Sequence, residues 1–143
     1  MHCEVRIPRN RKEFLLMVTQ HSYRPVVLCV DDDKAVLDLM RIALELKGFR
    51  VLAARDGRAA LEAFTVYPVD AVVLDYEMPG MNGCDVAREM TRLKPSVPKL
   101  LFSGGLDLSD EESRFFQGFC SKPCGVFTLA ARLNNMTDCA MSA

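Results

Sequence analysis

The stretch "VVLCVDDD", residues 26–33, places a short apolar run directly before three consecutive aspartates. An unbroken run of five apolar residues is typical of a strand that is buried on both faces of a parallel sheet. Two carboxylates about 4 Å apart repel each other by roughly 4 kcal/mol at an effective dielectric constant near 20. The stretch therefore predicts a buried strand that ends in concentrated negative charge, which a cation has to offset.

A helix is predicted directly after this strand. Asp33 is suited to cap its first turn, and Gly48 is suited to end it. Between these two residues, apolar side chains recur at the helical spacing i, i+3, i+4 and i+7, in the order Val36, Leu39, Met40 and Ala43.

The same alternation continues along the chain. Further strands are predicted over residues 50–54, 71–76, 99–104 and 118–123, and further helices over 57–64, around Val86, Met90 and Leu93, over 109–116 and over 126–133. The helix over 109–116 opens with Ser109, and Glu112 completes a capping box. Strands that alternate with helices predict an α/β fold, in which helices cover both faces of a five-stranded parallel sheet.

Polar residues lie at the ends of four of the five predicted strands, at the sheet edge where such folds bind ligands. They are Asp31 and Asp32, Asp75, Ser103 and Lys122. Carboxylate oxygens favour a hard divalent cation, so we expect Mg²⁺ here, with Mn²⁺ as an alternative. Asp75 lies alone near the end of the central strand and is followed by a Pro/Gly loop that holds the backbone open, which makes it the best candidate for a nucleophile toward phosphorus. Each residue alone has a structural explanation, as a cap, a turn or a solvated charge, and only their joint placement favours a site.

Four motifs give the chain a family resemblance: "VLCVDDD", "VVLDYEMPGMNG", "LLFSGG" and "CSKP". In this order they resemble the receiver domain of two-component response regulators, over residues 25 to about 134. The resemblance implies a flavodoxin-like sheet with strand order 2-1-3-4-5, as in the chemotaxis receiver. It also implies the site roles: Asp75 as phosphoacceptor; Asp32, Asp75 and the Glu77 backbone carbonyl as Mg²⁺ ligands, with Asp31 assisting through water; Ser103 and Lys122 as phosphoryl-binding groups; and Ser103 and Phe119 as switch residues.

The resemblance implies that a sensor histidine kinase or a histidine phosphotransfer protein supplies the phosphoryl group. About ten residues follow the last predicted helix, so we expect a stand-alone receiver that signals by contact with a downstream protein. Such a domain phosphorylates and dephosphorylates itself rather than turning over a substrate. Two alternatives remain open: a receiver-like adaptor that works without phosphorylation, and a small phosphohydrolase of the haloacid-dehalogenase type, which would want an aspartate where Glu77 stands.

Three features depart from the family pattern. The segment from Ser103 to Lys122 is a few residues short, which puts the fourth helix of the family and its usual switch surface in doubt. Phe119 replaces a more frequent tyrosine, and Cys124 stands where an aromatic residue commonly follows the Lys-Pro pair.

Composition narrows the class of protein. A formal net charge of -1 argues against a general nucleic-acid binder, and no apolar run is long enough to span a bilayer. The six cysteines form no ligand-like spacing and are expected to be reduced, in a cytoplasmic protein. We expect a flexible N-terminal extension over residues 1–24, a receiver domain over 25–135 and a C-terminal tail over 136–143. The apolar stretch "FLLMV" in the extension leaves a partner-binding or membrane-surface role open.

Overall fold

The structure is a computed structural model that describes residues 7–19, 24–104, 108–122 and 126–141, without the side chains of residues 17–19, 126–127 and 138–141. Its centre is a five-stranded sheet, β2-β1-β3-β4-β5, in which all neighbouring strands are parallel. The strands are β1 (Val26–Val30), β2 (Arg50–Ala54), β3 (Ala71–Leu74), β4 (Lys99–Ser103) and β5 (Gly118–Ser121). The predicted strand order is therefore confirmed.

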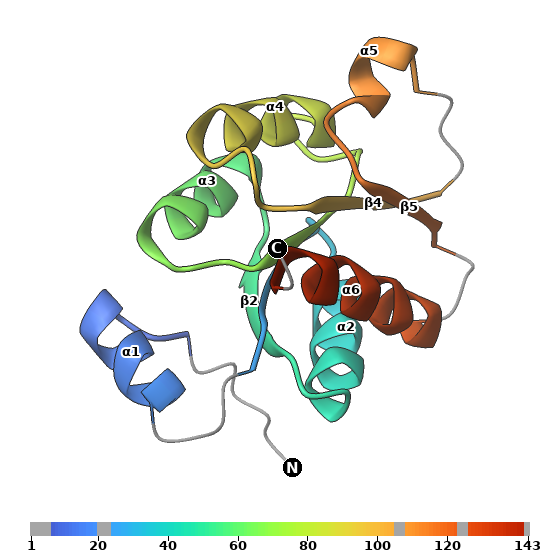
Figure 1. Cartoon of the computed structure of the whole chain (residues 1–143). Helices are drawn as coiled ribbons and strands as arrows, with labels where there is room; N and C mark the ends of the chain where they lie inside the picture. The colour runs from blue at the N-terminus through green and yellow to red at the C-terminus, as the bar shows by residue number, and fades with distance from the viewer. Residues whose placement is uncertain (1–6, 20–23, 105–107, 123–125, 142–143) are drawn as a thin grey trace.

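Helices cover both faces of this sheet, as Figure 1 shows. Helices α2 (Lys34–Leu46) and α6 (Val126–Met141) pack on one face, and α3 (Gly57–Val66) and α4 (Gly83–Leu93) pack on the other. Alternate residues of β1 point to the two sides, so Val27 and Cys29 join the α2–α6 core whereas Val26, Leu28 and Val30 join the α3–α4 core. The unbroken apolar run "VVLCV" is explained by this burial on both faces.

The predicted helix signals are present at α2 and at α5 (Asp110–Ser113). Asp33 caps α2, and Gly48 has a positive φ of 92° just beyond its end. Ser109 and Glu112 form the predicted capping box of α5. However, α5 has only 4 residues, fewer than the predicted range of 109–116, so the helix between β4 and β5 is a single turn.

Helix α6 is longer than predicted, because it runs through Met141 instead of giving way to a tail near residue 136. Thr137 explains part of the extension: its side chain is 1% exposed, and its hydroxyl donates to the Leu133 carbonyl at 2.9 Å. Three strands are shorter than predicted. Strands β3, β4 and β5 each end one or two residues before the predicted ends.

The N-terminal segment contains helix α1 (Arg11–Thr19), which the sequence analysis did not predict. Phe14 is 1% exposed and belongs to the core cluster under α3 and α4. Its ring centroid lies 5.2 Å from that of Tyr67, and the Tyr67 hydroxyl donates to the Pro8 carbonyl at 2.7 Å. The described part of the predicted extension is thus packed on the domain rather than extended from it.

Cys29 and Cys84 are buried free thiols and Cys120 is buried as well, whereas Cys124 lies outside the described residues. Among the helices in the described ranges, none is long and apolar enough to cross a bilayer.

Replacing Phe14 by Ala should destabilise the fold by about 3 kcal/mol, because it leaves a cavity in the α3–α4 core. Leu15→Ala is the matched control: Leu15 is 45% exposed, so its replacement should change the free energy of unfolding by less than about 0.5 kcal/mol. Urea unfolding of both variants measures the difference. Equal stabilities would show that α1 does not dock in solution.

Candidate functional site

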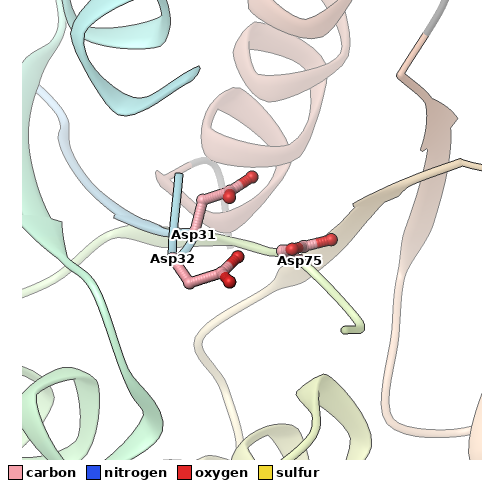
Figure 2. A group of neighbouring side chains, drawn as sticks. All are labelled: Asp31, Asp32 and Asp75. Atoms are coloured by element: carbon pink, nitrogen blue, oxygen red, sulfur yellow. The ribbon is translucent and has the colours of Figure 1, made fainter. Parts of the chain in front are cut away.

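Three carboxylates meet at the carboxyl edge of the sheet, where Figure 2 shows them side by side at the ends of β1 and β3. One oxygen from each of Asp31, Asp32 and Asp75 lies within 4.8 Å of the others. Asp31 is 0% exposed and Asp75 is 4% exposed, whereas Asp32 is exposed. The structure therefore brings together the three aspartates that the sequence predicted to share a site.

Strand register explains this meeting. Val30 pairs with Leu74, so the residues that follow them, Asp31 and Asp75, leave the sheet at the same level. The backbone then extends the sheet pairing by one step, because the Asp75 N–H donates to the Val30 carbonyl at 2.9 Å. Both buried carboxylates are thereby held by the backbone of the sheet and not by a loop.

The third aspartate of the run, Asp33, serves the helix instead. Its carboxylate accepts from the Ala35 N–H at 2.9 Å, which caps α2. Its own N–H donates to Asp31 Oδ1 at 2.9 Å and so orients that carboxylate. Asp33 is therefore a positioning residue for the site rather than a member of the carboxylate cluster.

Lys122 is the cation that the carboxylates require. Its Nζ lies 3.1 Å from Asp31 Oδ2 and 3.3 Å from Asp75 Oδ1. Burial, and then the charge of Asp31, raise the pKa of Asp75, while Lys122 opposes the rise without cancelling it. Burial lowers the pKa of Lys122, but its contacts with Asp31 and Asp75 outweigh that effect and raise it.

An open cavity of about 780 Å³ lies over these groups. Every predicted metal-binding and phosphoryl-binding residue borders it: Asp31, Asp32, Asp75, Glu77, Ser103 and Lys122. Phe119, the predicted switch residue, is not in its wall. It lies on β5 with 43% of its surface exposed, and its ring centroid is 6.0 Å from that of Phe116.

The loop after Asp75 returns close to the site because of two glycines. Gly80 has a φ of 84°, which a side chain would strain. A Cβ on Gly83 would lie 2.4 Å from the Asp75 carbonyl oxygen, and the Gly83 N–H donates to the Tyr76 carbonyl at 2.8 Å. The sequence analysis read this loop only as open backbone, although "PGMNG" carried the signal for a tight return.

Arg55 is a residue of this region that the sequence analysis missed. It follows β2, and its guanidinium donates to the Asp32 carbonyl at 3.2 Å. A single arginine after a strand has no motif that would identify it.

The cluster fits a hard divalent cation. Its donors are carboxylate oxygens, which Mg²⁺ and Mn²⁺ prefer. Asp31 Oδ2 is buried, and the Lys122 ammonium forms an ion pair with it at 3.1 Å. A buried carboxylate in this position can also accept from a water molecule bound to the cation.

Comparison with known proteins agrees with this geometry. A family model described as the response regulator receiver domain matches residues 27–134. The transcriptional regulatory protein KdpE of Mycobacterium tuberculosis is 34% identical over 111 residues, which are 76% of this chain and 49% of that protein. The sensor histidine kinase GacS of Pseudomonas protegens is 49% identical over 65 residues, which are 46% of this chain and 7% of the kinase.

Among solved structures, the response regulator protein TrrA of Thermotoga maritima, in complex with Mg(2+)-BeF, is similar with a TM-score of 0.74 and 27% identity. The match covers 78% of this chain and 98% of that one. The chain spans about half the length of KdpE and of the similar regulators that it matches.

Asp75→Asn should stabilise the fold near pH 7 without divalent cations, because it removes a buried negative charge from beside Asp31. The folded state raises the pKa of Asp75 above its ordinary value of 3.8, so folding favours the protonated carboxyl. The wild-type chain therefore loses stability as the pH rises from this ordinary value through the raised pKa. The advantage of the variant should disappear below the ordinary value.

Urea unfolding of both chains across this pH range measures the effect. Asp38→Asn is the control, because that carboxylate is partly exposed and pairs with Lys34 at 2.9 Å, so the variant should gain no stability. A loss of stability in Asp75→Asn near neutral pH would contradict the direction given for the Asp75 pKa.

Proposed function

The chain belongs to the response regulator receiver domain family of two-component systems, and from this premise we propose that it accepts a phosphoryl group on Asp75. The observation that carries the proposal is the place of Asp75, with two carboxylates within 4.8 Å and the Lys122 ammonium at 3.3 Å. The donor is a phosphohistidine of a sensor histidine kinase or a histidine phosphotransfer protein.

The transfer forms one bond and breaks one. A carboxylate oxygen of Asp75 attacks phosphorus, the phosphorus–nitrogen bond of the phosphohistidine breaks, and the imidazole leaves with the electron pair. The nucleophile has to be ionised, and the Lys122 ammonium favours that form because it lowers the pKa that burial raises. Phosphoryl transfer otherwise depends on positioning and on neutralising charge.

Lys122 and Ser103 are the proposed phosphoryl-binding residues. Both border the cavity over Asp75, and the Lys122 N–H donates to the Ser103 carbonyl at 3.1 Å, so the ends of β4 and β5 hold them together. The ammonium pairs with one phosphoryl oxygen, and the hydroxyl donates to another.

Mg²⁺ is the proposed cofactor, with Mn²⁺ as an alternative. Asp32, Asp75 and the Glu77 carbonyl would hold it, and Asp31 would assist through water. When bound, the ion supplies positive charge that offsets the carboxylates and the phosphoryl oxygens. The similar TrrA structure contains Mg(2+)-BeF, which supports the assignment.

Ser103 and Phe119 are the proposed switch residues. A phosphoryl group on Asp75 would draw the Ser103 hydroxyl toward it, and the half-exposed Phe119 would turn into the space beside β4. The signal then passes to a downstream protein by contact. In this proposal the chain is a cytoplasmic signalling domain that phosphorylates and dephosphorylates itself, without turning over a substrate.

Incubation with acetyl phosphate and Mg²⁺ should add one phosphoryl group, a gain of about 80 Da that Asp75→Asn abolishes because an amide cannot form the acyl phosphate. Intact-protein mass spectrometry measures the gain. Asp33→Asn is the control and should still be phosphorylated, since Asp33 caps α2. An undiminished gain in Asp75→Asn would show that another residue is the acceptor, and no gain in the wild-type chain would favour a phosphorylation-independent adaptor.

Asp32→Ala should weaken Mg²⁺ binding by a factor of ten or more, because it removes one of two direct carboxylate ligands. Asp33→Ala should instead lower the free energy of unfolding by about 1 kcal/mol, the usual contribution of an N-cap. Calorimetric titration with Mg²⁺ and urea unfolding separate the two effects. If both variants lose Mg²⁺ affinity equally, the roles of the two aspartates are misassigned.

A further inference from the structure

The end of the molecule opposite the cavity carries exposed apolar side chains. In a parallel sheet with crossover helices, the helices run back against the strands, so their last residues lie at the end where the strands begin. Val66 and Leu93 are the last residues of α3 and α4, and they are 43% and 40% exposed. The N-terminal segment adds Ile7, Leu15 and Leu16, which are 51%, 45% and 53% exposed.

Contacts with α3 and α4 place α1 at this same end. Phe14 packs on Tyr67, and the Tyr67 hydroxyl bonds the Pro8 carbonyl; Tyr67 directly follows Val66. Lys94 directly follows Leu93, and its ammonium donates to the Phe64 carbonyl at 2.7 Å. Figure 1 shows α1 beside α3. We call the five exposed residues Ile7, Leu15, Leu16, Val66 and Leu93 the apolar end.

Positive charge accompanies the apolar end. Arg9, Arg11 and Lys12 are exposed on and just before α1. The one acidic residue of this helix, Glu13, is engaged locally, because its carboxylate accepts from the Arg9 N–H at 3.0 Å. Burial lowers the pKa of Lys94, and the charge of the nearby Arg11 lowers it further. Cations therefore border the exposed apolar residues on the α1 side.

We propose that this end of the molecule binds the surface of an anionic lipid bilayer. Exposed leucine and isoleucine side chains beside arginine and lysine are the pattern of segments that lie in the membrane interface. The apolar side chains would enter the headgroup–acyl boundary, and Arg9, Arg11 and Lys12 would contact lipid phosphates. Because the cavity over Asp75 lies at the other end of the strands, it would face away from the bilayer.

Charge favours a lipid surface over a second copy of the chain. Two copies that met through their apolar ends would bring the three cations of each α1 together, and these like charges would repel. An anionic bilayer instead attracts them and presents no fixed shape to match. The proposal does not depend on phosphorylation of Asp75.

Sedimentation with vesicles tests the proposal on the full chain. The protein should bind vesicles of equal parts phosphatidylglycerol and phosphatidylcholine, and it should not bind vesicles of phosphatidylcholine alone. Arg11→Gln with Lys12→Gln should weaken binding about 30-fold, since each cation near an anionic surface contributes about 1 kcal/mol. Lys34→Gln with Arg58→Gln is the matched control: these exposed cations lie in the first turns of α2 and α3, at the cavity end, and their loss should leave binding nearly unchanged.

A second pair of variants tests the apolar contribution. Leu15→Ser with Leu16→Ser should abolish vesicle binding, and Leu39→Ser with Ile42→Ser, which replaces two exposed residues of α2, should preserve it. Failure of the wild-type chain to bind anionic vesicles, or equal losses in both charge variants, would overturn the proposal. Light scattering without lipid tests the remaining outcome. If the wild-type chain is a dimer and the variant Leu15→Ser with Leu16→Ser is a monomer, the apolar end is a protein interface instead.

Discussion

Repulsion among carboxylates is the physical condition that the other parts of this fold have to satisfy. The pairing of β1 with β3 places Asp31 and Asp75 at one level of the sheet, and both side chains are nearly fully buried. Neither can move away, because the sheet backbone holds them. The charge has to be offset from outside these two strands, and Lys122, from the end of β5, supplies the offset at 3.1 and 3.3 Å.

This arrangement couples the centre of the sheet to its edge. Lys122 follows the edge strand β5, and Phe119 lies on the same strand with nearly half of its surface exposed. Any change in charge at Asp75 alters the ion pair that ties this edge strand to the centre. The single turn of α5 lies on the connection between β4 and β5, where a full helix would resist rearrangement more strongly.

The two ends of the domain differ in chemistry. The carboxyl ends of the strands gather acidic side chains around a polar cavity, and the opposite end gathers exposed apolar side chains and the cations of α1. Phe14 makes α1 part of the second end, since its burial under α3 and α4 orients the neighbouring leucines outward. A chain with little net charge thus has strong local differences in charge and polarity.

Residue patterns predicted the strand–helix alternation, the caps at Asp33 and Ser109 and the residues that meet at the cavity, because each depends on local spacing and on the topology of a parallel sheet. The remaining features depend on contacts that form only in the folded chain. Phe14 looked like part of a loose tail because its partner, Tyr67, is distant in the chain. The Asp33 N–H donates to the Asp31 carboxylate, and the Arg55 guanidinium donates to the Asp32 carbonyl. Residue patterns do not predict such contacts with the backbone. The pKa of Asp75 likewise follows from burial and the distance to Lys122, which exist only in the folded chain.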